Sequence, residues 1–218
     1  MASRIALPNG SIFQIAATFG AVKPITAITN AAQGVVTSAA HGLADGDLIL
    51  IESGWGRIDG SAARVADADT DDFILENIDT TDPVFYAPGG GAGSLQSVLS
   101  WVEITKITAV SMSGGEQQFV TVGYLAEDND RQYPTNRNPM SMQLTVEDQP
   151  AAAYVPIVEG YTNTKVQTVG RLTLPNKDQI IYPGFVSITD TPTLERNQIM
   201  TRTVTFSLSG RPVRYRNV

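Results

Sequence analysis

Residues 101–125 read WVEITKITAVSMSGGEQQFVTVGYL, and this stretch decides the class of fold. Its second half, Gln118–Leu125, is rich in β-branched and aromatic side chains, which are enriched in strands. Gly114 and Gly115 separate the two halves, and a glycine pair supplies the positive φ angles that a tight β-turn needs. The stretch therefore predicts a β-hairpin in which Trp101–Val110 pairs with Gln118–Leu125.

The rest of the C-terminal half also has strand patterns. Apolar and polar side chains alternate with a period of two in Arg202–Leu208 and again in Met142–Val146, as in half-buried strands. Two further strands are predicted at Gly170–Leu174 and Phe185–Thr189, and a turn at Pro175–Asn176 lies between them. This half of the chain is therefore predicted to be mostly sheet.

One helix is predicted against this background, over Asp148–Gly160. Asp148 is suited to the N-cap, Ala151–Ala153 favour helix, and Gly160 is suited to the end. Pro156 argues against it, because a proline inside a helix removes a hydrogen bond and clashes with the preceding turn. A second segment, Ser94–Val102, fits a helix or a strand equally well.

Residues 31–95 differ from the rest of the chain in charge. All eleven acidic side chains of the first hundred residues lie between Asp45 and Asp82, and only Arg57 and Arg64 oppose them in this segment. Short apolar runs separated by turn residues indicate short strands within it. We therefore expect a small inserted acidic β module.

The borders of this module follow from composition. The segment 88–93, PGGGAG, predicts a flexible linker at its end, because glycine-rich runs commonly join modules. The expected division is a core domain of residues 1–30 plus 96–218 and a module of residues 31–95. The fold class is then mainly β, with one helix and one small inserted β module.

Composition excludes several classes of protein. The 218 residues carry 15 basic and 22 acidic side chains, a net charge of −7, which argues against a protein that mainly grips nucleic acid. The chain has no cysteine, which removes disulfides, zinc–thiolate sites and thiol nucleophiles. Apolar runs long enough for a membrane helix or a signal peptide are missing, so we expect no membrane partner and assembly in a cytoplasm.

No residue pattern points to catalysis or to a cofactor. His41 is the only histidine, no serine stands in a G-x-S-x-G context, and local hydrogen bonding next to a turn is the favoured role for His41. The run VADADTDDF suggests calcium, but the glutamate that an EF-hand loop requires is replaced by Ile78. A solvent-facing acidic turn is favoured, and we expect a protein that is not an enzyme and has no cofactor and no metal.

The C-terminus is basic. Five arginines follow the last acidic residue, Glu195, and they are Arg196, Arg202, Arg211, Arg214 and Arg216. We expect them to meet carboxylates, within one subunit or between subunits, because guanidinium groups match carboxylate geometry. Recognition of DNA is not favoured.

Several motifs together resemble the major tail proteins, or tail tube proteins, of long-tailed bacteriophages with non-contractile tails. They are IALPNGSIFQIAATFGAVKPITAITNA at 5–31, VVTSAAHGLADGD at 35–47, ESGWGRIDGSAARVADADTDDFILENIDTTD at 52–82, WVEITKITAVSMSGGEQQFVTVGYLAEDNDRQYPT at 101–135 and VSITDTPTLERNQIMTRTVTFSLSGRP at 186–212. The resemblance covers essentially the whole chain.

The resemblance implies a β-sandwich or barrel flanked by one α-helix. It also implies rings of six copies whose sheets join into an inner barrel, and stacking of these rings into a tube that conducts the genome. The implied partners are further copies, other tail proteins (tape measure, terminator and distal tail proteins) and phage DNA, which passes without specific binding. The implied location is the virion tail, assembled in the host cytoplasm.

The resemblance also suggests where copies meet. Residues 126–139 match a long loop that contacts neighbouring subunits or rings, and its charged side chains Asp128, Asp130, Arg131 and Arg137 are the candidate interface residues. We expect the 31–95 module on the tube exterior, and we expect a negative lumen that repels DNA phosphates.

Two alternatives remain open. A tail terminator or adaptor protein would form one ring without a tube. A monomeric β-sandwich that binds carbohydrate would need exposed aromatic side chains, and of the two tryptophans, Trp55 and Trp101, the second is expected in the core.

Overall fold

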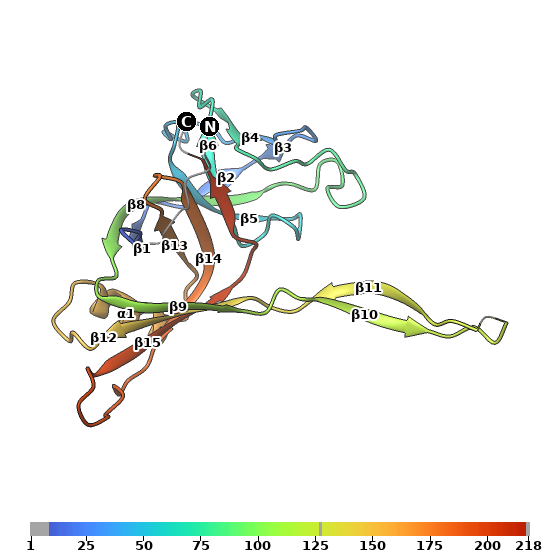
Figure 1. The fold of residues 1–218 in the computed structure, drawn as a ribbon. Coiled ribbons are helices and arrows are strands. Elements are labelled where there is room, and N and C mark those ends of the chain that lie inside the picture. Colours follow the sequence, from blue (N-terminus) through green and yellow to red (C-terminus); the bar gives the residue numbers. More distant parts are fainter. Residues whose placement is uncertain (1–8, 127, 217–218) are drawn as a thin grey trace, which may run out of the picture.

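A computed structural model describes residues 9–126 and 128–216, and it confirms a mainly β protein with one helix in that part of the chain (Figure 1). The elements in chain order are β1 (Ile12–Phe19), β2 (Lys23–Ile25), β3 (Ala27–Ile28), β4 (Val35–Thr37), β5 (Leu48–Ser53), β6 (Ser61–Ala66), β7 (Asp72–Leu75), β8 (Gly93–Glu103), β9 (Ile107–Ser113), β10 (Gln117–Val122), β11 (Arg131–Arg137), β12 (Ser141–Glu147), α1 (Tyr154–Thr164), β13 (Thr168–Thr173), β14 (Gln179–Ile188), β15 (Thr201–Leu208) and β16 (Val213–Tyr215).

Fourteen of the described strands form one continuous antiparallel sheet. The strand order is β3-β4-β7-β6-β5-β8-β1-β13-β14-β15-β12-β9, with β16 on β14 and β2 on β8, while β10 and β11 form a separate ribbon. Strand β8 connects the two parts of the sheet, because its first half pairs with β2 and β5 and its second half pairs with β1. Ser94–Val102, which fitted helix or strand from sequence, is therefore strand.

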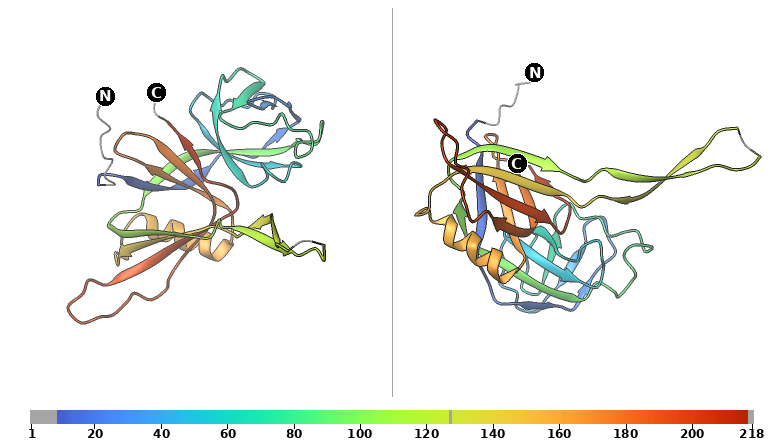
Figure 2. Two further views of the ribbon diagram at one scale, coloured as in Figure 1. Left: turned by 45° about the vertical axis from the view of Figure 1, so that its right-hand side comes forward. Right: turned by 90° about the horizontal axis from the view of Figure 1, so that it is seen from below.

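The main core lies where β1, β12, β14 and β15 pack against α1. The helix buries Tyr154, Val155 and Val158 in this core, and burial of each such side chain contributes on the order of 1.5–3 kcal/mol. The opposing strands contribute the residues that alternation predicted: Met142, Leu144, Val146, Val204 and Phe206. Figure 2 shows α1 lying along one side of these strands.

The helix begins later than predicted. Its N-cap is Ala153, whose side chain makes no capping hydrogen bond, and not Asp148. Pro156 is therefore the third helical residue, a position at which a backbone N–H has no partner within the helix. The sequence objection to Pro156 disappears because the proline removes no helical hydrogen bond there.

The helix also ends later than predicted, because it continues through Gly160. It stops at the C-cap Lys165, which has a left-handed φ of 55° and donates its backbone N–H to Tyr161 O at 2.9 Å. A single left-handed residue of this kind satisfies a free carbonyl at a helix end. Lys165 takes the role that the sequence assigned to Gly160.

The predicted hairpin between Trp101–Val110 and Gln118–Leu125 is wrong. Strand β9 pairs with β12, and β10 pairs with β11, so the chain makes one long two-part hairpin whose turn lies beyond Val122. Gly114 and Gly115 do have the expected positive φ, 82° at each, but they form a kink halfway along it. A Cβ on Gly114 would lie 1.9 Å from Pro139 O, so the returning limb passes too close for any larger residue.

A second cluster of buried side chains lies within residues 25–95 and includes Trp55 and Phe73. The predicted flexible linker at its end is wrong, because three of its four glycines, Gly90, Gly91 and Gly93, pack closely against other parts of the chain. A Cβ on Gly93 would lie 2.0 Å from Glu52 O, and one on Gly91 would lie 3.0 Å from Ile28 Cβ. The glycines allow close approach of backbones. The division of the chain at residues 31 and 95 stays a prediction.

Tyr215 on β16 belongs to a third buried cluster, whose members come from both parts of the sheet. Its buried ring packs with Leu48, Leu50 and Val169, and its hydroxyl accepts a hydrogen bond from Arg64 N at 2.9 Å. The Arg64 guanidinium lies 4.6 Å from the ring centroid. The C-terminal strand therefore holds β5 and β6 firmly against the main body.

We predict that Tyr215 makes the protein sensitive to alkali. Burial raises the pKa of Tyr215 from 10.0 to about 12, so its contribution to stability is complete below pH 10 and is lost as the pH rises through 12. Tyr215→Phe should flatten the fall in unfolding free energy over this window by up to about 1.4 kcal/mol per pH unit. Urea unfolding at several pH values measures this slope. Tyr124→Phe, at an exposed position, is the control, and equal slopes in wild type and Tyr215→Phe would contradict the prediction.

Candidate assembly surface

A long β-ribbon projects from the body (Figures 1 and 2). We call its outer part, residues 117–137, the arm; it contains β10, β11 and the turn between them. Every residue of β11 is exposed, and most of β10 is exposed. An isolated two-stranded ribbon is marginally stable in water, so an arm of this length indicates a surface that needs a partner.

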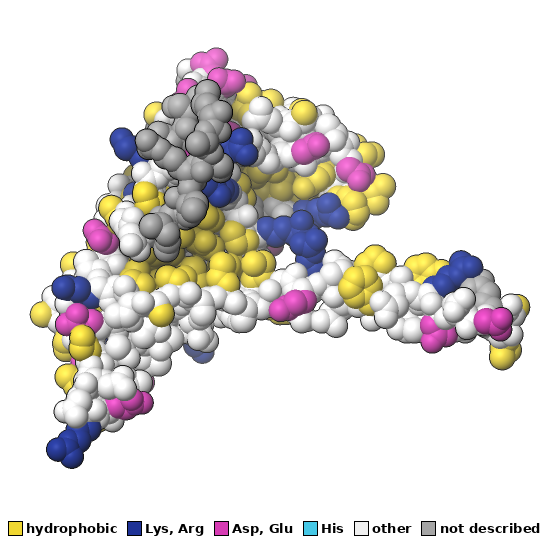
Figure 3. Space-filling model, in the orientation of Figure 1, with side chains coloured by type: hydrophobic (Ala, Val, Ile, Leu, Met, Phe, Trp, Pro, Cys, Tyr) yellow, Lys and Arg dark blue, Asp and Glu magenta, His cyan; other side chains and the backbone are white. Residues whose placement is uncertain are grey.

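The arm exposes large apolar side chains on both of its faces. In the pair of strands Phe119 lies opposite Pro134, and Val120 lies opposite Tyr133. Phe119 is 56% exposed, and Val120 and Tyr133 are also exposed. Figure 3 shows several hydrophobic groups, in yellow, along the arm. Exposed apolar groups gathered on one element mark an interaction site more often than an ordinary surface.

Strand β9 carries apolar side chains that face the core but are not covered. Val110 lies opposite Leu144 and Met112 opposite Met142, and directly opposed residues of an antiparallel pair share a face of the sheet. Leu144 and Met142 are fully buried, whereas Val110 is 52% and Met112 is 48% exposed. The apolar face of the sheet therefore extends one strand beyond the layer that covers it.

The outer backbone edge of β9 is also open. The strand is last in the sheet order, so no strand of the described chain pairs with its outer side. Edge strands are usually protected by charged residues, proline or short length, and β9 has seven residues without charge or proline. At the other end of the sheet, β3 is only two residues long. The unprotected edge is the one that continues into the arm.

The four predicted interface residues all lie on the arm and are exposed. Asp128 and Asp130 are in the turn at its tip, Arg131 begins β11, and Arg137 ends β11. Arg131 lies 5.9 Å from the ring of Tyr124, and Arg137 Nε donates to Gln117 Oε1 at 3.2 Å. Half of the expected loop at 126–139 is strand, because residues 131–137 form β11. The contacts of these residues with another copy stay a prediction.

A second projecting segment was not found from the sequence. The connection between β14 and β15 exposes Leu194 (77%) and Ile199 (68%). Its base is closed by Thr193, whose N–H donates to Thr201 O at 2.9 Å. Figure 1 shows this connection at the opposite side of the body from the arm. Apolar residues within a run of turn residues, TPTLERNQIM at 191–200, were the available signal.

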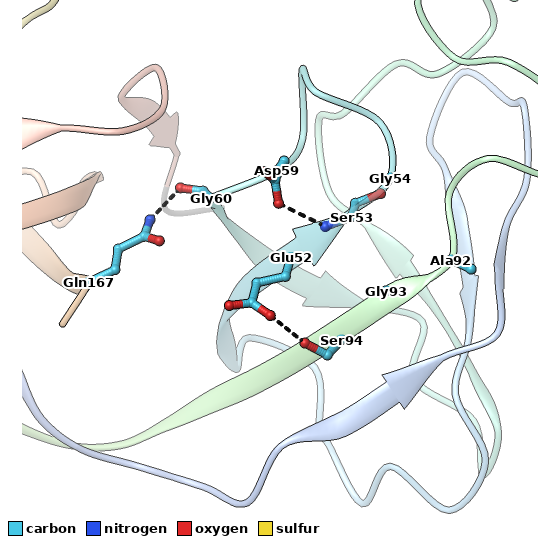
Figure 4. Close-up of a pocket in the computed structure, with 9 residues that line it drawn as sticks. All are labelled: Glu52, Ser53, Gly54, Asp59, Gly60, Ala92, Gly93, Ser94 and Gln167. Carbon is cyan, nitrogen blue, oxygen red and sulfur yellow. Dashed lines mark hydrogen bonds between the residues drawn. The ribbon is translucent and has the colours of Figure 1, made fainter.

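A cleft of roughly 470 Å³ lies between the 53–60 loop and the body (Figure 4). Its two carboxylates already accept hydrogen bonds, Glu52 from Ser94 Oγ at 2.9 Å and Asp59 from the Ser53 N–H at 3.1 Å. Within residues 9–126 and 128–216, no three histidine, aspartate or glutamate residues gather as metal ligands. These hydrogen bonds fix the strands and the loop that line the cleft.

The polar residues singled out in the sequence serve local structure. His41 Nδ1 accepts the Leu43 N–H at 3.0 Å, which confirms the predicted local hydrogen bond. Asp71 of the acidic run accepts the Ala40 N–H at 2.8 Å, and Asp69 accepts the Thr70 N–H at the same distance. These carboxylates fix turns, as short polar side chains commonly do.

Two of the five C-terminal arginines meet carboxylates of the same chain. Arg214 Nε lies 3.0 Å from Asp178 Oδ2, and Arg202 Nη2 lies 3.5 Å from Glu159 Oε1. These pairs agree with the predicted arginine–carboxylate contacts. They also use guanidinium groups that a DNA-binding tail would leave free.

The tryptophans do not form a carbohydrate platform. Trp55 is 3% exposed and donates its indole N–H to Ala87 O at 2.8 Å. Trp101 was expected in the core, but it is only partly buried and stacks under Arg171 at 4.2 Å. Neither ring presents an open face of the kind that sugar binding uses.

Comparison with known proteins gave one family. The model of the family described as phage tail tube protein, TTP, matches residues 53–217. A search of curated proteins found no match. Among solved structures, the chain is similar to the sheath/tube terminator of an extracellular contractile injection system, PVC, in its extended state, with 15% identity and a TM-score of 0.37 over 52% of this chain and 86% of that chain. In the described part of the chain no helix is long and apolar enough to span a membrane.

We predict that Gly114 is required for the ribbon to form. Gly114→Ala places a Cβ against Pro139 O at a φ of 82°, so it should lower the free energy of unfolding by roughly 1–3 kcal/mol. Gly10→Ala has a similar φ of 89° but meets nothing within 4 Å, so it controls for backbone strain alone. Urea unfolding of both variants gives the difference. An equal loss in the two would show that the close approach to Pro139 is not limiting.

Proposed function

Because the chain belongs to the phage tail tube protein family, we propose that it polymerises as stacked rings into the tube of a long, non-contractile phage tail. The family match makes the protein a structural component of the virion tail. The ring of six copies and the passage of the genome through the tube belong to this proposal. Assembly takes place in the host cytoplasm, and other tail proteins meet the tube at its two ends.

The observation that carries the proposal is the uncovered strand β9. A second copy that added a strand to its open edge would satisfy the free backbone groups and would cover Val110 and Met112. The opposite end of the sheet, at β3, presents a different surface, so such a contact is heterologous. A heterologous contact closes into a ring when its rotation fits. Growth is then limited to the axis of the ring.

The arm supplies a second contact, between neighbours or between successive rings. Its apolar faces need cover, and its tip carries Asp128, Asp130 and Arg131. Oppositely charged groups on an exposed tip favour one orientation of docking over others. We therefore keep these residues, with Arg137, as the candidate contacts of the arm.

DNA passes through this tube without specific binding. Residues 31–95 carry 2 of the 15 basic and 11 of the 22 acidic side chains, so the rest of the chain has 13 basic and 11 acidic ones. We place residues 31–95 outside the bore, because an extra β module inside would obstruct it. A lumen that repels phosphates then requires carboxylates of the remaining body to face the bore.

We predict that Val110→Lys combined with Met112→Lys abolishes assembly and leaves the monomer folded. Both side chains are half exposed, so the melting temperature should not change, but two buried ammonium groups would be very unfavourable at a subunit contact. Negative-stain electron microscopy at high protein concentration should show tubes for wild type and isolated particles for the variant. Val84→Lys, at an 82% exposed valine, is the control.

The same images test the alternatives. Single rings of the wild type would indicate a terminator or adaptor protein. Isolated wild-type particles at all concentrations would contradict the proposed function. Tubes formed by the double variant would show that β9 is not a contact.

A further inference from the structure

Outside the arm, four arginines of the described chain donate hydrogen bonds to other side chains, and three of them have an acidic partner. Arg64 pairs with Glu76, Arg202 with Glu159 and Arg214 with Asp178. The fourth, Arg171 on β13, has no carboxylate within ion-pair distance among residues 9–126 and 128–216. Buried or half-buried charges are normally paired, so Arg171 is an exception that needs a physical reason.

The Arg171 guanidinium is held in a fixed orientation. Its Nε and Nη2 donate to the same oxygen, Gln14 Oε1, at 3.1 and 2.7 Å. Its plane lies over the ring of Trp101, with Cζ 4.2 Å from the ring centroid. Strands β1 and β8 thus hold the cation of Arg171, which lies on β13. Their two side chains that contact it are the neutral amide of Gln14 and the aromatic ring of Trp101. Burial accordingly lowers the pKa of Arg171, with no acidic group to oppose the effect.

The nearest acidic side chain on the same row of the sheet is too far away to pair. Glu103 lies opposite Gln14, and Gln14 lies opposite Arg171. Glu103 and Arg171 are therefore two strands apart, which corresponds to roughly 10 Å between their backbones. Gln14 occupies the position between them, so within residues 9–126 and 128–216 no carboxylate compensates the guanidinium charge.

We propose that Arg171 binds a carboxylate of a second copy of this chain in the assembled tube. The inference rests on the proposed self-assembly and specifies one of its contacts. The guanidinium keeps N–H groups that do not bond Gln14, and a pre-oriented planar fork loses little freedom when it accepts a carboxylate. A partly desolvated pair of this kind is stronger than a surface ion pair, because water screens it less.

A carboxylate of another copy fits better than a phosphate of DNA. Each copy has 22 acidic and 15 basic side chains, so at least seven carboxylates per copy lack a basic partner of their own. Binding to the DNA backbone depends on several cations acting together, whereas Arg171 is a single guanidinium beside an amide and an indole. One arginine side chain is therefore suited to binding one carboxylate.

The test is Arg171→Met, compared with wild type for both stability and assembly. Methionine is unbranched and packs well on an aromatic ring, so it replaces the contact with Trp101 but not the charge. The melting temperature of the unassembled variant should equal or exceed that of wild type, because an uncompensated cation is removed. The fraction that sediments as tubes should fall at least about fivefold, as expected for loss of a charge-assisted hydrogen bond. Arg171→Lys keeps the positive charge but loses the planar guanidinium with its paired N–H donors, so it should assemble to an intermediate extent.

Arg211→Met is the matched control, since Arg211 is an exposed arginine near the end of the chain. It should change neither the melting temperature nor the sedimenting fraction. Wild-type levels of tubes from Arg171→Met would overturn the inference. A lower melting temperature for Arg171→Met would also overturn it, because the arginine would then stabilise its own chain.

The outcomes separate this inference from the proposed function. A wild-type chain that forms no tubes overturns the proposed function, whereas normal tubes from Arg171→Met overturn the inference alone. Fluorescence anisotropy with a 20-base-pair DNA duplex tests whether Arg171 binds a DNA phosphate instead. A variant that assembles normally but loses duplex binding would show that Arg171 binds phosphate, contrary to the proposal.

Discussion

Strand β9 is complete on one side and open on the other, and the remaining features of the molecule follow from that constraint. Its inner side pairs with β12, while its outer backbone edge is open and the core-facing side chains Val110 and Met112 are only about half covered. A free edge of seven uncharged residues invites pairing with any available strand. A protein that keeps such an edge needs a defined partner for it, and the proposed assembly into a ring would provide one.

The arm extends the same constraint away from the body. Gly114 and Gly115 bend the ribbon without breaking it, so the chain that leaves β9 continues outward as β10 and returns as β11. In the body, Tyr215 lies in a buried cluster that combines side chains of β5 and β13, and its hydroxyl accepts the Arg64 N–H. A body with exposed projections can place a neighbour in one orientation, and in the proposed assembly repeated identical contacts would then produce rings and a tube. The half-buried Arg171 fits the same arrangement. Among the described residues of its own chain it has no carboxylate partner, and a neighbouring copy can supply one.

Sequence reasoning predicted what depends on local patterns. Alternation placed Met142–Val146 and Arg202–Leu208 in strands, and the HGL turn gave the hydrogen bond of His41. It failed where contacts between distant segments of the chain determine the local structure. The glycine pair at 114–115 has the predicted φ angles, but Pro139 and Met140 across the ribbon determine that it is a kink and not a turn.

The candidate surface was predicted only in part, for the same reason. The charged residues at 128–137 were found because they form a compact group in the sequence. Arg171 was not found, because its partner Gln14 is 157 residues away, and no local pattern reports that separation.

The central claim is that residues 107–122 form the edge that joins copies, and hydrogen exchange of purified protein before and after assembly tests it most directly. Amides of β9 that point away from β12, and amides of β10 that point away from β11, should exchange rapidly in the monomer and become strongly protected in tubes. Unchanged exchange of these amides in tubes would contradict the claim.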